Sequence, residues 1–363
     1  MENLVMNAAF WKGKKVLITG HTGFKGSWLS LWLHTMGVNT LGYSLPPPTK
    51  PSLFEIANIS EEMVSIKGDV RDLDHLKSVI AEHTPEIVIH MAAQSLVRYS
   101  YTNPIETYST NVMGTANVLE AVRQTDCVKV VLIVTSDKCY ENREWLWGYR
   151  ENDPMGGHDP YASSKGCAEL VTSAYHSSYF SKKNDQTQPT ALASVRAGNV
   201  IGGGDWAGDR LIPDIVRAIM QNRSVAIRNP NAMRPWQYVL EPLEGYLSLA
   251  EKLWKQGQEF SGGWNFGPDD ADCRSVLWIV KHLSHFWEGD IHWELDAAEN
   301  PHEATYLKLD CSKAKRLLGW SPKLTLLTAL EWVVEWYQGY LNHMDMRVLS
   351  KAQISRYENM GRA

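Results

Sequence analysis

The sequence has 363 residues, which at roughly 150 residues per domain predicts about two domains or one enlarged α/β unit with an added lobe. Apolar residues make up 44% and charged residues 21% of the chain, a balance that argues against a disordered or fibrous protein. The net charge is −5, with 36 Lys and Arg against 41 Asp and Glu and no long basic block, so nucleic acid is not an expected partner.

The sequence indicates neither secretion nor membrane insertion. The first fifteen residues include the acidic Glu2 and no continuous apolar run, and no window elsewhere approaches 18 apolar residues. Five cysteines are scattered along the chain without a C-x-x-C pair, which argues against disulfides and a structural zinc site. They are Cys127, Cys139, Cys167, Cys273 and Cys311. We therefore expect reduced thiols, a cytoplasmic protein and no bound metal.

The first half of the chain alternates between strand patterns and helix patterns. Residues 15–19 (KVLIT) form a β-branched run that stops at Gly20, and residues 27–36 carry apolar side chains at helical spacing. Later stretches repeat the alternation, with strands expected at 86–91, 129–135 and 190–195 and a helix at 112–123. This pattern predicts an α/β fold with a Rossmann-type, doubly wound parallel sheet covered on both faces.

The pattern changes after about Gly198, where glycines, prolines and tryptophans interrupt it. Helical patterns return at residues 211–220, 242–255, 275–287 and 326–340. We expect a dinucleotide-binding domain over residues 1–198 and a smaller α/β lobe for the substrate, mainly over 199–345. Part of 232–265 is expected to pack back onto the first domain, and 346–363 to form a loosely held tail.

A glycine-rich segment links the first expected strand to the first expected helix. Gly20, Gly23 and Gly26 stand in a G-x-x-G-x-x-G pattern. Such glycines allow a tight turn, close approach of the backbone to a pyrophosphate and close packing of helix on strand, with helix N-terminal amides facing the phosphates. The strand–loop–helix context predicts a dinucleotide cofactor rather than a plain turn.

The sequence favours NAD over NADP. The end of the second expected strand, residues 41–45, carries neither an acid for the ribose nor an arginine for a 2′-phosphate, although Lys25 in the glycine loop can counter this preference. Asp69, followed by Val70, comes after a third strand-like stretch over 63–66. Its carboxylate is either a partner for an adenine amino group or a solvated loop side chain.

A second group of polar residues predicts acid–base chemistry. Tyr161 and Lys165 in YASSK lie one helical turn apart, and a nearby ammonium is expected to lower the pKa of the phenol. The segment Thr135-Ser136-Asp137-Lys138 follows an expected sheet strand, at the end where α/β folds place their ligand crevice. The two segments together supply hydroxyl, phenol, carboxyl and amine groups.

The motifs GHTGFKG, HMAAQS, TSDKCY and YASSK, in this order and spacing, resemble the extended short-chain dehydrogenase/reductase family that acts on nucleotide sugars, from about residue 14 to 336. The resemblance implies a 4,6-dehydratase that oxidises carbon 4 of the sugar, removes water across carbons 5 and 6 and returns hydride to carbon 6. Related dehydratases for dTDP- and GDP-sugars generally carry an acidic pair after the hydroxyl residue. Asp137-Lys138 stands there instead, which points to the branch that uses CDP-sugars.

The resemblance also implies roles for individual residues. Tyr161 is similar to the base at the 4-hydroxyl, Lys165 to the lysine that binds the nicotinamide ribose, and Ser136 to the hydroxyl that orients the 4-oxygen. Asp137 is the implied acid for the departing 6-hydroxyl, and Lys138 the implied base for the proton on carbon 5. The cofactor-binding residues expected for NAD are Gly20, Thr22, Gly23, Phe24, Lys25, Gly26, Asp69, Val70, Ala92, Ala93, Gln94, Asn111, Tyr161 and Lys165.

Substrate contacts are expected from the second lobe. Arg234, in RPWQYV, is a candidate phosphate clamp because a guanidinium group matches phosphate geometry, and its alternative is a surface salt bridge. The expected substrate-binding residues are Ser95, Asn199, Arg210, Leu211, Arg234, Tyr238, Asn265, His302 and Tyr306.

Two other readings of the sequence stay open. A nucleotide-sugar 4-epimerase, or a dehydratase for another nucleotide sugar, shares the glycine loop, hydroxyl, tyrosine and lysine, but an epimerase needs no acid–base pair for carbons 5 and 6. A non-catalytic regulator on the same fold is a different class, and the intact Ser136, Tyr161 and Lys165 set argues against it. The family resemblance further implies a homo-oligomer, dimer or tetramer, with 112–123 and 162–175 packed across a twofold axis.

Overall fold

The structure is a computed structural model that describes residues 7–181, 189–287, 291–296 and 306–361. Its centre is a seven-stranded, fully parallel sheet in the order β10-β6-β5-β4-β1-β2-β3. The strands are β1 (Lys15–Thr19), β2 (Asn39–Ser44), β3 (Val64–Lys67), β4 (Ile87–His90), β5 (Val130–Val134), β6 (Ala191–Ala197) and β10 (Gly262–Phe266). The predicted Rossmann-type sheet is confirmed.

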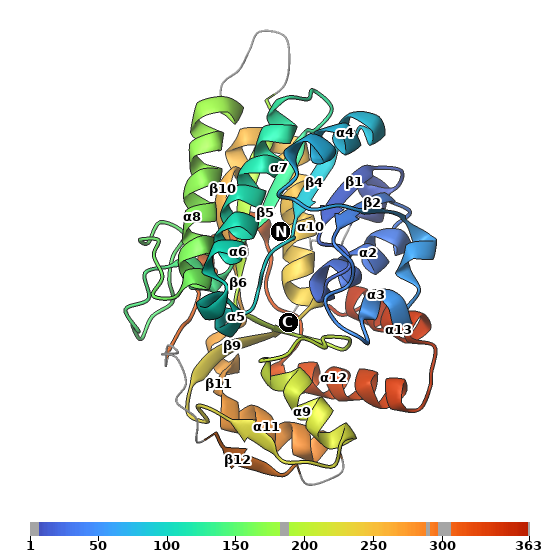
Figure 1. Cartoon of the computed structure of the whole chain (residues 1–363), viewed down its shortest axis with the longest axis vertical. Helices are drawn as coiled ribbons and strands as arrows, with labels where there is room; N and C mark the ends of the chain where they lie inside the picture. Colours follow the sequence, from blue (N-terminus) through green and yellow to red (C-terminus); the bar gives the residue numbers. More distant parts are fainter. Residues whose placement is uncertain (1–6, 182–188, 288–290, 297–305, 362–363) are drawn as a thin grey trace.

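Both faces of the central strands of this sheet are buried, as a parallel sheet requires, whereas the edge strand β3 is mostly exposed. Successive side chains of β1 alternate, with Leu17 in one apolar cluster and Val16 and Ile18 in the other. Helices α4 (Leu73–His83), α7 (Gly114–Arg123) and α8 (Pro160–Tyr175) form one layer, and α2 (Phe24–Thr35) and α10 (Leu240–Gln256) lie on the opposite face (Figure 1). The doubly wound architecture therefore follows from strands that are apolar on both sides.

A smaller part lies beyond the carboxyl ends of the strands, in the lower half of Figure 1. It contains a three-stranded sheet in the order β11-β9-β7 and a two-stranded sheet β12-β8. The strands are β7 (Asn199–Ile201), β8 (Val225–Ile227), β9 (Met233–Tyr238), β11 (Cys273–Ser275) and β12 (Trp293–Leu295). Helices α9 (Leu211–Met220), α11 (Val276–Phe286) and α12 (Leu326–Leu341) accompany them.

The chain leaves the main sheet at Gly198, between β6 and β7, and returns to it through α10 and the edge strand β10. We propose that the two parts correspond to a dinucleotide-binding domain and a substrate lobe. Short segments complete the fold and are α1 (Ala8–Trp11), α3 (Leu53–Ile56), α5 (Val97–Thr102), α6 (Pro104–Tyr108), η1 (Ile59–Glu62), η2 (Ser109–Met113), η3 (Asp137–Cys139), η4 (His176–Phe180), η5 (Gly257–Phe260), η6 (Asp270–Asp272) and η7 (Ala314–Leu318).

The expectation of a loosely held C-terminal tail is wrong. Residues after 345 form α13 (Met346–Glu358), which packs beside α2 and α12 and buries Ile354 and Tyr357. The Tyr357 hydroxyl donates to a carboxylate oxygen of Glu241 at 2.8 Å. The polar composition of this segment concealed a narrow apolar stripe that is sufficient to dock the helix.

Membrane insertion finds no support in the helices that the structure describes, because none of them combines the length and the apolar character that a bilayer span needs.

Candidate active site

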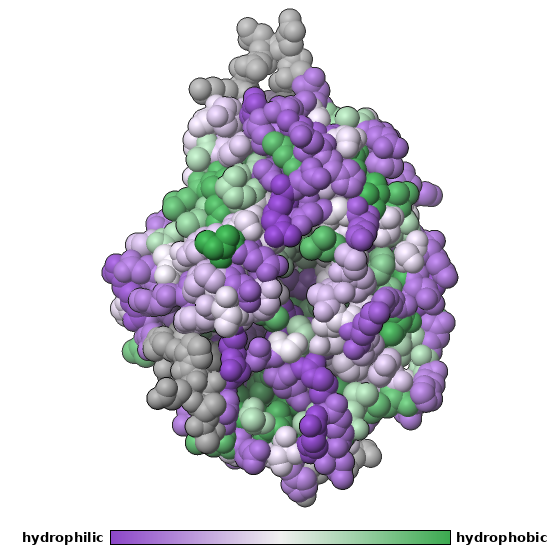
Figure 2. Space-filling view, viewed as in Figure 1, coloured by the Kyte–Doolittle hydropathy of each residue, from purple (hydrophilic) through white to green (hydrophobic). Residues whose placement is uncertain are grey.

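One large cavity, of about 1280 Å³, lies between the carboxyl edge of the main sheet and the smaller lobe. The face of the molecule in Figure 2 is hollowed between these two parts. Parallel α/β sheets place their ligands at this edge, where the strand order reverses. The cavity is therefore the expected ligand site of this fold.

The glycine loop forms one wall of the cavity, and each glycine has a geometric reason. Gly20 has φ of 78°, and a Cβ atom there would lie 2.7 Å from the backbone nitrogen of Ala92. A Cβ on Gly26 would lie 2.2 Å from the carbonyl oxygen of Gly20. The N-cap residue of α2 is Gly23, where the nearest atom to an added Cβ is the Gly20 oxygen at 3.4 Å. Only Gly23 leaves open space beside helix N-terminal amides, which is the shape that a pyrophosphate group fills.

Most of the predicted cofactor residues line this same cavity. They are Gly20, Thr22, Gly23, Phe24, Lys25, Gly26, Asp69, Val70, Ala92, Ala93, Gln94, Tyr161 and Lys165. Asn111 does not line it. Its buried amide instead exchanges two hydrogen bonds with the backbone of Gln94, and its Nδ2 also donates to Ser164 Oγ. Asn111 thus holds the loop that carries Gln94, and we propose no direct cofactor contact for it.

The Asp69 carboxylate is occupied by a neighbour in this structure. Arg71 donates from Nε and Nη2 to Asp69, with the shorter contact at 2.6 Å to Oδ2. This arginine lowers the pKa of Asp69, which is therefore an acceptor over the neutral range. Asp69 stays a proposed partner for an adenine amino group.

The acid–base residues meet at the end of β5. Ser136 Oγ donates to Asp137 Oδ1 at 3.0 Å, and the Lys138 Nζ atom lies 3.7 Å from that same oxygen. Asp137 is buried, whereas Lys138 is partly exposed to the cavity. From α8, the Tyr161 phenol interacts with the Ser136 hydroxyl. The five candidate catalytic residues, Ser136, Asp137, Lys138, Tyr161 and Lys165, all line the cavity.

The expected lowering of the Tyr161 pKa is not observed. Burial raises the pKa of Tyr161 to about 12, against the lowering effects of the Ser136 hydrogen bond and the Arg210 charge. The Lys165 ammonium does not compensate, because its Nζ donates to the Val134 carbonyl oxygen at 3.2 Å and burial lowers its own pKa to about 8. Both residues belong to α8 as the spacing predicts, but desolvation dominates the pKa of each.

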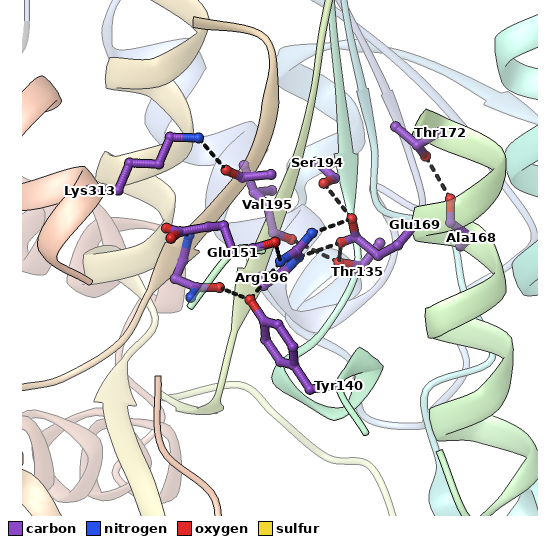
Figure 3. Close-up of polar contacts among 12 residues, drawn as sticks. Thr135, Tyr140, Glu151, Ala168, Glu169, Thr172, Ser194, Val195, Arg196 and Lys313 are labelled. Atoms are coloured by element: carbon purple, nitrogen blue, oxygen red, sulfur yellow. Dashed lines mark hydrogen bonds and ion pairs between the residues drawn. The ribbon is translucent and has the colours of Figure 1, made fainter. Parts of the chain in front are cut away.

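A buried polar network links α8 with β6 and with the residue that follows β5 (Figure 3). Glu169, one turn after Lys165 on α8, accepts from Arg196 Nε at 2.9 Å and Nη2 at 2.8 Å, and from Ser194 Oγ at 2.6 Å. The Thr135 hydroxyl donates to the same carboxylate. Arg196 continues to the Tyr140 hydroxyl at 2.6 Å. A buried ion pair with all of these partners ties β5, β6 and α8 together, and the sequence reading missed it.

The predicted substrate residues divide into two groups. Ser95, Asn199, Arg210, Leu211 and Arg234 line the cavity. Arg210 connects two segments of the cavity lining, because it donates to Asp205 Oδ2 at 2.9 Å and to Ser95 Oγ at 2.8 Å. Arg234 is almost fully buried beside the cavity, which excludes a plain surface salt bridge for this residue. His302 lies outside the described residues.

Three other candidates have their polar groups committed elsewhere, which the sequence did not foresee. The Tyr238 hydroxyl donates to Gln353 of α13, and the Asn265 amide bonds Tyr140, Tyr149 and Asp310. The Tyr306 hydroxyl donates to the Leu146 carbonyl oxygen. None of the three lines the cavity, so the structure does not support direct substrate contacts for them.

This fold and this set of groups define a short-chain dehydrogenase/reductase of the extended type. Residues 17–332 match the family described as GDP-mannose 4,6 dehydratase, and the chain belongs to this family.

Individual relatives agree with this assignment. A protein of Salmonella typhimurium named CDP-glucose 4,6-dehydratase is 58% identical over 348 residues, covering 96% of this chain and 97% of the relative. The dTDP-glucose 4,6-dehydratase 1 of Escherichia coli is 25% identical, covering 91% of this chain and 94% of the relative.

Solved structures show the same fold. The dTDP-glucose 4,6-dehydratase from Bacillus anthracis in complex with NAD has a TM-score of 0.74 and 21% identity, covering 92% of this chain and 100% of that chain. The UDP-glucose 4-epimerase from Thermotoga maritima with UDP-glucose has a TM-score of 0.75 and 20% identity, covering 90% and 99%. At these identities the comparisons establish the architecture, and activity must be argued from the site and the nearer relative.

Proposed function

We propose that this protein is an NAD-dependent dehydratase that converts CDP-D-glucose to CDP-4-dehydro-6-deoxy-D-glucose. The observation that carries the proposal is the meeting of Ser136, Asp137, Lys138 and Tyr161 with the glycine loop around one cavity. The 58% identity to a CDP-glucose 4,6-dehydratase over 96% of the chain supports the choice of substrate.

The residues around the glycine loop fit NAD. Gly23 leaves room for the pyrophosphate at the start of α2, and Lys165, which lines the same cavity, is the proposed partner of the nicotinamide ribose. When bound, NAD would take hydride from carbon 4 of the sugar and give it back at carbon 6, as a proton returns to carbon 5. The chain's own residues hold the cofactor, orient the sugar and move the protons.

Oxidation at carbon 4 uses Tyr161 and Ser136. The Ser136 hydroxyl orients the 4-oxygen of the sugar, and the Tyr161 phenolate takes the proton of the 4-hydroxyl. The Ser136 interaction and the positive charge of Arg210 both act to lower the pKa of Tyr161, opposing its burial. Substrate oxidation leaves a 4-ketone, which makes the proton on carbon 5 acidic.

The elimination of water then uses Asp137 and Lys138, which follow Ser136 in the chain. Lys138 takes the proton from carbon 5, and Asp137 gives its proton to the departing 6-hydroxyl, so that water leaves. The two groups are direct neighbours, with Lys138 Nζ 3.7 Å from Asp137 Oδ1. Elimination requires the amine form of Lys138 together with the carboxylic acid form of Asp137.

The experiment that tests this function is incubation of the purified protein and NAD with CDP-, dTDP-, GDP- and UDP-hexoses in parallel. We expect a 4-keto-6-deoxy product from CDP-D-glucose at a rate far above that from the other three. An epimerised hexose that keeps its 6-hydroxyl would instead identify a 4-epimerase, and a faster reaction with another nucleotide would overturn the CDP assignment.

The protein is also proposed to form a homo-oligomer through the layer of α7 and α8. Ile105, Met113, Leu170 and Tyr179 are large apolar side chains on or beside this layer, each more than half exposed. Association of this face with a second copy covers them. Sedimentation that shows only monomer at micromolar concentration contradicts this proposal.

The proposed location is the cytoplasm. Cys127, Cys139, Cys167, Cys273 and Cys311 are all unpaired in the structure, as suits a reducing compartment.

A further inference from the structure

The segment of residues 136–139 carries proposed acid–base groups on a very short element. Ser136 caps η3, which has only three residues, and its Oγ accepts from the Lys138 backbone N–H at 3.2 Å. A single 3₁₀ turn has poor hydrogen-bond geometry and little stability of its own. The position of this segment therefore depends on what holds the residues on either side of it, Thr135 and Tyr140.

Glu169 holds the residue before the segment. The Thr135 hydroxyl donates to the Glu169 carboxylate, and the Thr135 backbone N–H donates to the Val195 carbonyl oxygen at 2.9 Å. Glu169 is buried on α8, about two helical turns after Tyr161. Because one helix carries both the phenol and the carboxylate, the contact with Thr135 relates the position of Ser136 to that of Tyr161.

Arg196 holds the residue after the segment. Its Nη1 donates to the Tyr140 hydroxyl at 2.6 Å, while its Nε and Nη2 donate to the Glu169 carboxylate. The Tyr140 hydroxyl donates in turn to Asn265 Oδ1 at 2.7 Å. The two residues that flank the segment, Thr135 and Tyr140, are thus joined through one buried ion pair (Figure 3).

We propose that the ion pair of Glu169 and Arg196 positions residues 136–139 for catalysis by holding Thr135 and Tyr140. Within the described part of the chain, Glu169, Arg196 and Tyr140 do not line the cavity, so the pair acts through the segment and not on a ligand. Desolvation offsets much of the attraction in a buried ion pair, which makes holding a defined geometry a better reason for its presence than stability. The inference rests on the proposed function, in which the segment carries catalytic groups.

The first test removes the Thr135 hydroxyl. Thr135→Val keeps the branched shape and the backbone bond to Val195 but loses the contact with Glu169. We expect turnover to fall about 10-fold, with KM and the affinity for NAD within about 2-fold, because a small misplacement of reacting groups lowers the rate more than it lowers binding. Thr135→Ser, which keeps the hydroxyl, should retain at least about half of the original rate. Unchanged turnover in Thr135→Val overturns the proposal.

Ser194→Ala is the matched control for Thr135→Val. The Ser194 hydroxyl donates to the same Glu169 carboxylate at 2.6 Å, but Ser194 lies within β6 and does not flank the segment 136–139. Each variant removes one buried hydrogen bond to this carboxylate, so a purely structural effect would lower turnover equally in both. We expect Ser194→Ala to keep turnover within about 2-fold. Equal losses in the two variants overturn the proposal.

The contact on the other side is tested in Tyr140→Phe. This variant loses the hydrogen bond from Arg196 and keeps the ring stacked on Tyr149, with centroids 5.2 Å apart. We expect turnover to fall about 3- to 10-fold with unchanged KM. Tyr149→Phe removes a hydroxyl of the same stack that bonds Asn142 and Arg143 instead, and should not lower turnover. A full rate in Tyr140→Phe would show that Arg196 does not hold the segment, which overturns the proposal.

A measurement without substrate separates this proposal from the proposed function. Amide hydrogen exchange of the whole protein, read by mass spectrometry in peptides that cover residues 134–141, reports how firmly the segment is held. Exchange there should become about 10-fold faster in Thr135→Val and stay unchanged in Ser194→Ala. Unchanged exchange in both variants overturns the proposal. Faster exchange in Thr135→Val alone, in a protein that does not dehydrate CDP-D-glucose, counts against the proposed function and supports the positioning role.

Discussion

The Nζ atom of Lys138 lies 3.7 Å from Oδ1 of Asp137, so the two groups proposed for elimination are also the partners of one ion pair. Asp137 is buried and Lys138 is partly exposed to the cavity. The proposed acid and the proposed base are thus direct neighbours at the end of β5. Removing either side chain should consequently alter the second half of the reaction more than the first.

Asp137→Asn and Lys138→Met are expected to separate the two halves. Asparagine keeps the shape but has no carboxylic proton for the 6-hydroxyl, and methionine keeps the length but has no base. Each variant should exchange the hydrogen on carbon 4 while releasing at least about 100-fold less dehydrated product. Solvent deuterium entering carbon 5 rapidly in Lys138→Met would show that another group is the base.

Gly23→Val is expected to abolish NAD binding and leave the fold intact. The backbone at Gly23 has φ of −79°, which valine adopts, and an added Cβ meets its nearest atom at 3.4 Å. The branched side chain would fill the space for the pyrophosphate at the start of α2. Calorimetric titration with NAD and circular dichroism measure the two effects, and tight NAD binding by the folded variant would refute the placement.

Tyr161→Phe is expected to lose at least about 100-fold in turnover while binding CDP-D-glucose as before. The hydroxyl group is the proposed base for the 4-hydroxyl, and the variant lacks it. Because burial holds the pKa of Tyr161 near 12, the oxidation rate of the unaltered protein should rise with pH between about 7 and 9. A pH-independent rate, or a near-normal rate in the variant, would point to another base.

Glu241→Gln is expected to flatten the pH dependence of stability. Burial raises the pKa of Glu241 from 4.5 to about 7. The folded protein therefore binds this proton more tightly than the unfolded chain, and the free energy of unfolding falls as pH rises from 4.5 to 7. The contribution is on the order of 2–3 kcal/mol. Urea unfolding at several pH values measures the slope.

A matched variant checks the Glu241 result. Glu335→Gln changes a carboxylate that is about two-fifths exposed and paired with Arg356, and should leave the pH slope nearly unchanged. If both variants keep the original slope, Glu241 does not carry the effect.

Sequence periodicity predicted β1, β4, β5 and β6 because these strands are short apolar runs. It did not predict the edge strand β10, whose sequence GGWNF has no such run. The run at 15–19 and the helix at 211–220 coincide with β1 and α9. The glycine loop was also predicted from the sequence, since Gly20 and Gly26 cannot carry side chains in this geometry. The C-terminal helix α13 was missed because its composition is mostly polar and its docking depends on distant partners such as Glu241.

The directions in which the side chains of the site point were harder to predict from the sequence than the positions of its strands and loops. Tyr238 lies in the same strand as Arg234, yet its hydroxyl turns to Gln353. Glu169 and Arg196 form a buried ion pair although they are 27 positions apart in the chain. Their sequence spacing alone does not predict this contact. One signal was available, since a glutamate four residues after Lys165 lies on the same face of α8.

In the proposed reaction hydride leaves carbon 4 of CDP-D-glucose and returns at carbon 6, and water is lost between these two steps. The most direct measurement uses CDP-D-glucose carrying deuterium at carbon 4, with product analysed by mass spectrometry and NMR. We predict a product lighter by one water, a ketone at carbon 4 and the deuterium in the methyl group at carbon 6. Deuterium retained at carbon 4 of a product that keeps its 6-hydroxyl, with inversion at that carbon, would contradict the account.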